Sequence, residues 1–386
     1  MKEFVFRLYT KVLYGEGIAK RLGAECKKLN ASKVFFVTDS FMVEHSAAFP
    51  VLIDSLKNTG LEVKVFSDVE PDPSIVAIDR VAAAMKEFGA DIAVALGGGS
   101  PMDTAKLACM LQTNAGSVSD YMRKTRSVDN PAVPVICIPT TAGTGSEVTS
   151  FGVVTDSDAG EKIGVAHDSM MPKLAIIDPE LQLSMPPALT AATGMDALCH
   201  AIEAFVSIDA EPLSDAMCLH AIRLIGENIR KAVANGRDME TRGKMALASL
   251  AAGVGFAQAG LGAVHGIAHC LGAMYHVPHG VANALMLPYV MSFNVMASME
   301  KFREIAIALG ENVTGLSLRD AAYRSVEAVK LLNEDLGIPQ TLKEVGVKES
   351  DFSSIIKNTM TYGRLPFNPR TVTEKDVENI LTTAMG

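Results

Sequence analysis

Apolar residues alternate along the first 180 residues between short β-branched or aromatic runs and longer stretches with helical spacing. The short runs predict strands at 33–38, 61–66, 91–96 and 134–138, followed by further short strands at 150–155 and 174–177. Between them, 41–58 and 75–88 have the spacing of amphipathic helices, and Gly60 or Gly89 follows as a stop signal. Strands that alternate with helices in this way predict a parallel α/β sheet.

From residue 186 onward the pattern is helical almost throughout, and no strand run is found. Helices are predicted at 196–207, 213–234, 239–258, 264–271, 279–296 and 318–336. Consecutive prolines at Pro186 and Pro187 interrupt regular structure. We therefore predict an α/β domain over residues 1–185 and an all-helical domain over residues 186–386. No low-complexity linker separates them, so we expect packed domains with a ligand site between them.

The stretch from Met245 to Met299 contains no Asp, Glu, Lys or Arg, and its length alone would allow two membrane spans. It also carries four histidines, Gln258, two asparagines and many glycines, and such polar groups are costly in hydrocarbon. We therefore expect no membrane span. The composition instead favours Ala- and Gly-rich helices that pack inside the protein around a polar site.

Charge and cysteine usage narrow the cellular setting. The 386 residues include 35 Lys and Arg against 44 Asp and Glu, which gives a formal net charge of -9 without long runs of like charge. An acidic chain without basic runs is not expected to bind nucleic acid or an anionic membrane. The six cysteines are scattered without a CxxC pair, and the N-terminus lacks the continuous apolar core of a signal peptide. We expect reduced thiols and a cytoplasmic protein.

Two loops rich in small or hydroxyl residues follow predicted strands. The first contains Gly97, Gly98, Gly99 and Ser100 and leads into a helix that opens at Pro101, and the second contains Thr140, Thr141, Thr144 and Ser146. Glycines let backbone N–H groups approach an anion, and a helix N-terminus adds partial positive charge. Neither GxGxxG nor GxxxxGK[ST] matches, and a turn without a ligand is the alternative for each loop alone. Because ligands of open α/β sheets bind at the C-terminal ends of the strands, the pair predicts a nucleotide site.

Asp39 stands at the end of the first predicted strand. A carboxylate at that position can accept hydrogen bonds from an adenosine ribose and repel a 2′-phosphate, which favours NAD over NADP. The alternative role for this aspartate is a helix N-cap.

A set of potential metal ligands lies in the predicted helical domain. Asp196 and His200 are four residues apart and therefore share one face of a helix, and His265 and His269 repeat that spacing before His279. Imidazole and carboxylate groups suit Fe²⁺, Zn²⁺, Ni²⁺ or Co²⁺. Any one of these histidines alone could be a hydrogen-bonded core residue. Together, in sequence with so few charges, they predict a divalent metal held as a Lewis acid.

Four segments carry a resemblance to a known family. GGGSPMDTAK, PTTAGTGSEVT, ATGMDALCHAIEA and GLGAVHGIAHCLGAMYHVPHGVANALMLP closely resemble motifs of the iron-dependent (group III) alcohol dehydrogenases, and the similarity covers nearly the whole chain. The resemblance implies an N-terminal α/β dinucleotide-binding domain and a C-terminal all-helical metal domain, which is the dehydroquinate-synthase-like fold. It also implies a homo-oligomer, as a dimer or larger.

The resemblance also assigns roles to residues of this chain. It implies metal ligands at Asp196, His200, His265 and His279. His269 then lies close to the nicotinamide and substrate, and Asp103 near the nicotinamide end, so both are candidate catalytic residues. Lys162 matches a lysine near the cofactor ribose, and the residues of the two loops, with Ser146 among them, match the cofactor contacts.

The resulting hypothesis is an NAD-linked, Fe²⁺-dependent alcohol dehydrogenase or aldehyde reductase, with Zn²⁺ or another divalent metal as the alternative. The reaction is hydride transfer that interconverts a primary alcohol or diol and its aldehyde. A short substrate is expected because the charge-free stretch predicts an apolar pocket. One alternative is a metal- and NAD-dependent lyase of the same fold, and another is a nucleotide-binding module without turnover.

Overall fold

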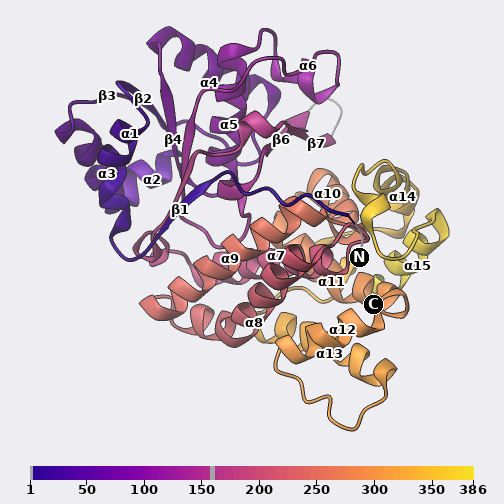
Figure 1. Ribbon diagram of the computed structural model, residues 1–386. Helices are drawn as coiled ribbons and strands as arrows, with labels where there is room; N and C mark the ends of the chain where they lie inside the picture. The colour runs from indigo at the N-terminus through magenta and orange to yellow at the C-terminus, as the bar shows by residue number, and fades with distance from the viewer. Residues whose placement is uncertain (1–2, 157–160) are drawn as a thin grey trace. The chain divides into compact units, whose positions relative to one another are not determined.

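The computed structural model describes residues 3–156 and 161–386, and within them the chain forms two compact units. One unit comprises Leu8–Thr141 and Gly145–Ser184, and the other comprises Met185–Gly386, Ala142–Thr144 and the segment up to Arg7. The first is built on a parallel sheet and the second is helical (Figure 1), so the predicted fold class is confirmed. The compact units do not show whether each part folds on its own. The predicted domain boundary between residues 185 and 186 therefore stays a prediction.

The first unit contains a six-stranded parallel sheet with strand order β1-β8-β5-β4-β2-β3. Its strands are β1 (Lys11–Tyr14), β2 (Lys33–Val37), β3 (Glu62–Phe66), β4 (Ile92–Gly97), β5 (Val135–Pro139) and β8 (Leu174–Ile177). Its helices are α1 (Leu22–Lys28), α2 (Ser40–His45), α3 (Ala48–Asn58), α4 (Ile75–Phe88), α5 (Gly99–Thr113) and α6 (Val118–Met122). Five of the six predicted strands lie in this sheet, and β1 is an addition at its edge.

Helices cover both faces of this sheet because successive strand residues point to opposite sides. Val34 and Phe36 of β2 are buried against α1, α2 and α3, whereas Phe35 and Val37 are buried against α4, α5 and α6. Burial on both faces explains why these strands read as continuous apolar runs. The sheet is therefore a rigid platform, and the loops that leave its C-terminal edge have fixed starting points.

Two details of the first unit differ from the prediction. The segment 41–58 forms two helices because Ser46 is extended between them, and its Oγ accepts a hydrogen bond from Ala48 N–H. The strand predicted at 150–155 lies outside the main sheet. It is β6 (Phe151–Asp156), which pairs antiparallel with β7 (Glu161–Ala166) in a separate ribbon. The sequence pattern missed β7 because charged residues and Gly164 interrupt its apolar positions.

The second unit is helical throughout its described residues. Its α-helices are α7 (Pro187–Val206), α8 (Pro212–Ala234), α9 (Met239–Ala259), α10 (Ala263–Tyr275), α11 (His279–Asn294), α12 (Met299–Ala308), α13 (Leu318–Asp335), α14 (Phe352–Met360) and α15 (Glu374–Met385). Pro187 is the first residue of α7, where its missing N–H costs nothing, so the proline pair opens a helix nine residues earlier than predicted. The prediction also missed α12, α14 and α15, which are short, with 10, 9 and 12 residues.

The charge-free stretch forms α9, α10 and α11 inside the second unit. His279–Ala297 is long and apolar enough to cross a membrane, with a mean hydropathy of 1.3, but 61% of its apolar window is buried inside the protein. α9 and α10 meet the same criterion only as a pair bent by 108°. A buried core helix passes this test equally well, and these helices pack as such.

Candidate functional site

Three loops meet at the C-terminal edge of the parallel sheet, because the strands that precede them are neighbours in the order β5-β4-β2. Thr140 N–H after β5 donates to Gly97 O at the end of β4, at 2.9 Å. Thr38 Oγ1 after β2 donates to Leu96 O, also at 2.9 Å. The structure thus brings the glycine loop and the start of the Thr-rich loop together, with Asp39 close by in the chain. Thr144 belongs to the helical unit.

The glycine loop presents an uncapped helix N-terminus. Gly97 has φ 146°, and a Cβ there would lie 2.6 Å from Pro101 Cγ, so this turn requires glycine. Gly98 is the N-cap of α5 and offers no side-chain hydrogen bond to the first N–H groups of the helix. These N–H groups are suited to an anion such as a diphosphate.

Asp39 and Lys162 have partners within the protein. Asp39 is the N-cap of α2, and its Oδ1 accepts Met42 N–H at 2.8 Å, which is the capping role named above as the alternative. Lys162 Nζ lies 2.8 Å from Asp72 Oδ2, and Asp72 N–H donates to Ser100 Oγ at 3.2 Å. The capping bond leaves the other carboxylate oxygen of Asp39 available, so its contact with a ribose stays a prediction.

Asp103 and Lys106 form a buried ion pair on α5. Lys106 Nζ lies 3.1 Å from Asp103 Oδ1, and it donates to Ser146 Oγ at 2.6 Å and Thr149 Oγ1 at 3.3 Å. Asp103 accepts Ser146 Oγ–H at 2.6 Å and Val153 N–H at 3.0 Å. This network ties the glycine-loop helix to the Thr-rich loop. Both carboxylate oxygens of Asp103 are used within the protein, and its catalytic role stays a prediction.

The structure brings Asp196, His200, His265 and His279 into one cluster. One ligand atom from each side chain lies within 4.8 Å of every other, and three helices supply them: α7 the first two, α10 the third and α11 the fourth. Gly280 allows this approach, because a Cβ there would lie 2.3 Å from Ala192 O of α7. A carboxylate and three imidazoles at this spacing form a donor set for a divalent transition metal.

Hydrogen bonds at the outer ring nitrogens orient two of the histidines. His200 Nδ1 lies 3.2 Å from Gly143 O, so Nδ1 donates and Nε2 is left as the acceptor. His265 Nδ1 lies 2.5 Å from Glu203 Oε2, while Glu203 Oε1 accepts Val264 N–H at 2.7 Å. A metal-ligating histidine is commonly held this way by a carboxylate or carbonyl. In both histidines the lone pair that a metal would take is therefore on Nε2.

Burial controls the charges in the cluster. Burial lowers the pKa of His265 well below its ordinary value and also lowers that of His200, so both imidazoles stay neutral at pH 7. Burial opposes ionisation of Asp196, but the three imidazoles and the Asn283 N–H outweigh it and lower its pKa. Burial raises the pKa of Glu203 to about 7. The cluster itself thus presents one carboxylate together with the neutral imidazoles of His200 and His265.

His269 lies beside the cluster. Its ring centroid is 5.5 Å from that of His279 and 6.1 Å from that of His265, and Tyr362 approaches its ring edge to face at 5.3 Å. It is half-buried, and its side chain is not part of the four-ligand group. Its predicted role close to the nicotinamide and substrate stays a prediction.

The C-terminal segment holds the beginning of α10. Asn368 and Asn294 exchange side-chain hydrogen bonds of 2.8 and 2.9 Å, and Asn368 Oδ1 also accepts Ala263 N–H at 3.4 Å. With Glu203 on Val264, these contacts satisfy the first N–H groups of the helix that carries His265.

Sequence reasoning missed Glu203, Asn283 and Lys106. Glu203 lies three residues after His200, and Asn283 lies four residues after His279, so each shares a helix face with a predicted ligand. That spacing was a usable signal. Lys106 had none, because its partners lie on another loop.

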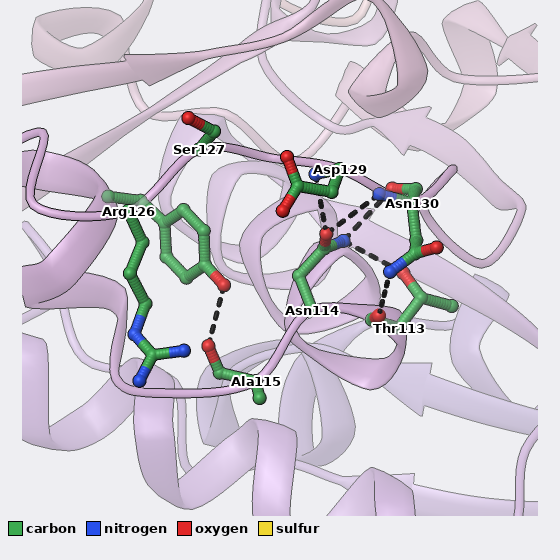
Figure 2. Close-up of a pocket in the computed structure, with 8 residues that line it drawn as sticks. Thr113, Asn114, Ala115, Arg126, Ser127, Asp129 and Asn130 are labelled. Atoms are coloured by element: carbon green, nitrogen blue, oxygen red, sulfur yellow. Dashed lines mark hydrogen bonds between the residues drawn. The ribbon is translucent and has the colours of Figure 1, made fainter.

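The structure also contains a pocket of about 470 Å³ that the sequence did not indicate. It lies at the C-terminal end of α5, roughly 20 Å along that helix from the glycine loop. Figure 2 shows Asn114 at its centre, where the amide donates to Asn130 O and accepts from the N–H groups of Asp129 and Asn130. These hydrogen bonds fix the loop that contains Asp129 and Asn130 against the end of α5.

Known proteins match the chain along nearly its full length. The model of the iron-containing alcohol dehydrogenase family matches residues 10–179, and the C-terminal model of the Fe-containing alcohol dehydrogenase family matches residues 190–385. The chain belongs to the iron-containing alcohol dehydrogenase family. The resemblance found in the motifs is confirmed, and this iron-containing alcohol dehydrogenase is an oxidoreductase.

Individual relatives support the family assignment. The NAD-dependent methanol dehydrogenase of Bacillus methanolicus is 42% identical over 96% of this chain and 97% of its own. The 1,3-propanediol dehydrogenase of Klebsiella pneumoniae is 41% identical over 96% of both chains. A crystal structure of a 1,3-propanediol oxidoreductase covers all of both chains with a TM-score of 0.96 at 40% identity. These relatives favour the alcohol dehydrogenase over the same-fold lyase and the non-catalytic module.

Proposed function

We propose that this iron-containing alcohol dehydrogenase interconverts a short primary alcohol or diol and its aldehyde, with NAD as the hydride carrier. The observation that carries the proposal is the group of one carboxylate and three imidazoles that lie within ligand distance of one another. The names of the similar methanol and 1,3-propanediol dehydrogenases support this substrate class and this cofactor.

We assign Asp196, His200, His265 and His279 as the metal ligands. The donor set fits Fe²⁺, and Zn²⁺ or another divalent metal is the alternative. The single carboxylate offsets only half of a divalent charge. A cation held there supplies Lewis acidity, which lowers the pKa of an alcohol hydroxyl and polarises an aldehyde carbonyl.

The remaining roles fall to residues around these ligands. Glu203 and Gly143 O orient the imidazoles of His265 and His200 through Nδ1. His269 is the candidate to hold or pass the proton of the alcohol, because its ring lies beside His279 and an imidazole can act as a general acid or base. The apolar helices around the cluster exclude water from the reacting groups.

We assign the cofactor site to the loops at the C-terminal edge of the sheet. The candidate contacts are Asp39, Gly97, Gly98, Gly99, Ser100, Thr140, Thr141, Thr144, Ser146 and Lys162, with Asp103 near the nicotinamide end. The uncapped N-terminus of α5 would take the diphosphate. The carboxylate of Asp39 would repel the 2′-phosphate of NADP.

One assay tests the activity. Protein purified without oxygen is analysed for bound metal, and formation of NADH is followed with methanol, ethanol, butanol and 1,3-propanediol, with and without added Fe²⁺. We expect turnover that depends on the bound metal and on a primary alcohol. Equal turnover after complete metal removal would rule out the assigned mechanism.

A conservative variant tests the cofactor choice. Asn is as good an N-cap as Asp, so Asp39→Asn keeps the cap on Met42 N–H while it removes the negative charge. We expect kcat/KM for NADP to rise and that for NAD to fall, with unchanged stability. If the ratio of the two stays at the wild-type value, Asp39 does not select the cofactor.

We also propose that the enzyme works in the cytoplasm and as a homo-oligomer. All six cysteines are free and buried, which suits a reducing compartment. Light scattering on the purified protein measures the number of chains.

A further inference from the structure

Asn283 lies inside the cluster of metal-ligating side chains. Its Nδ2 is 2.7 Å from Asp196 Oδ1, 3.1 Å from His265 Nε2 and 3.1 Å from His279 Nε2. The residue is fully buried on α11, one turn after His279. One amide nitrogen thus contacts ligand atoms from three different helices.

The hydrogen-bonding capacity of the amide does not match this environment. An amide NH₂ carries two hydrogens, so it can satisfy at most two of the three acceptors at one time. The amide oxygen, Asn283 Oδ1, is also buried and has no hydrogen-bond partner among the described residues. A buried polar atom left in this way costs free energy, so the arrangement needs a reason.

A divalent cation would bind through the same imidazole lone pairs that accept hydrogen bonds from the Asn283 amide. Transition metals bind imidazole nitrogen and carboxylate oxygen at roughly 2.0 to 2.2 Å. An N–H donor and a cation cannot share one nitrogen lone pair. His265 Nε2 and His279 Nε2 each have a single lone pair, so loading of the metal must break the Asn283 hydrogen bonds to these two atoms.

We propose that Asn283 is a placeholder for the cation. In the metal-free protein its NH₂ group donates to two of these ligand atoms at a time and keeps the three helices together, and its hydrogen bonds to the imidazoles are lost when metal binds. It is a positioning residue, and the inference rests on the proposed metal site. Asn283 therefore stabilises the metal-free form more than the loaded form, and it weakens metal binding.

The sign of that effect separates this role from an ordinary supporting one. A residue that only orients the ligands around the metal would, when removed, weaken metal affinity. A placeholder has the opposite effect, because its removal destabilises the competing metal-free state more than the metal-loaded state. Loss of one or two hydrogen bonds to the imidazoles predicts Co²⁺ binding tighter by about threefold to a hundredfold in Asn283→Ala.

Asn333 provides a matched control. It is a buried asparagine of the same unit whose Nδ2 donates to Ala284 O at 2.7 Å and whose Oδ1 also has no partner among the described residues. This hydrogen bond goes to the backbone of α11 and not to a metal-ligating side chain. Asn333→Ala should lower the stability of metal-free and metal-loaded protein by the same amount.

The experiment compares wild type, Asn283→Ala and Asn333→Ala, each metal-free and loaded with Co²⁺. Co²⁺ affinity is measured by competition with a chelator, the thermal midpoint by circular dichroism, and the ligand set by the visible absorption of Co²⁺. We expect Asn283→Ala alone to bind Co²⁺ more tightly and to show a larger rise in midpoint on loading. If Asn283→Ala folds only when Co²⁺ is present, its metal-free form is destabilised more than its loaded form, which also supports the proposal.

Two outcomes would overturn the inference, and they differ from each other. Unchanged or weaker Co²⁺ binding by Asn283→Ala, with normal binding by wild type, removes the placeholder role and leaves the metal site intact. Failure of wild type to bind Co²⁺ removes the metal assignment itself.

Discussion

The two units each bury a polar cluster, and the clusters differ in whether their charges are compensated. In the α/β unit, Lys106 and Asp103 neutralise each other, and hydroxyl groups use their remaining hydrogen-bonding positions. In the helical unit, Asp196 and three imidazoles turn only acceptors toward one another, and one amide stands among them. The first cluster is complete within the protein. The second is complementary to a cation.

This difference shows how a structural polar cluster and a binding site can be told apart without a ligand. Burial is costly in both, and a folded chain normally satisfies the groups it buries. A cluster with matched donors and acceptors needs no further explanation. A cluster with a surplus of acceptors from several helices is complementary to a positive charge.

The largest expected effect comes from removing one ligand. His265→Ala should abolish metal retention and reduce turnover below detection, because the imidazole held by Glu203 is lost. Elemental analysis after dialysis and NADH formation measure the two together. His220→Ala, at an exposed position of α8, is the control and should change neither. Wild-type turnover by a metal-free variant would contradict the assignment.

Removal of one charge from the Lys106–Asp103 pair should lower the free energy of unfolding and leave metal binding unchanged. Lys106→Met leaves the Asp103 carboxylate buried beside neutral groups, which should cost about 3 to 5 kcal/mol in urea unfolding. Addition of Asp103→Asn should recover most of that loss, because it removes the unpaired charge. Loss of bound metal in the folded Lys106→Met protein would show that the clusters are not independent.

A pH dependence should come from Glu147, the buried neighbour of Ser146. Burial raises its pKa from 4.5 to about 7, against the backbone N–H and Lys106, which lower it. The folded state then binds more protons than the unfolded state between these pH values, so stability falls as pH rises through that range, by up to about 3 kcal/mol. Glu147→Gln should flatten this part of the urea-unfolding profile. An unchanged slope would show that Glu147 is not the group that titrates.

The smallest effect concerns the support of one ligand. Glu203 accepts from Val264 and His265 with separate oxygens, and Glu203→Gln has only one oxygen for both. Metal affinity, measured by chelator competition, should weaken about tenfold to a hundredfold. Glu211→Gln is the matched control, since Glu211 also accepts two N–H groups with its two oxygens but lies at the start of α8. Equal affinities for the two variants would remove Glu203 from the metal site.

The sequence predicted most of what depends on local spacing. Strands buried on both faces read as apolar runs, and Asp196 and His200 share a helix face because 3.6 residues make a turn. The placement of β6 in a separate ribbon could not be predicted, since pairing partners are set by tertiary contacts. The Lys106 network was hidden for the same reason, because Asp103 and Ser146 are joined only by the fold.

The hydrogen bonds of Asn368 have a consequence for how the enzyme is made. Asn368 and Asn294 hold the beginning of α10, so the helix that carries His265 depends on residues near the end of the chain. On the ribosome, α10 therefore emerges long before the amide that fixes its first turn. A premature stop codon ahead of Asn368, or a protease cut there, would leave every ligand in the polypeptide and still loosen the helix that presents one of them.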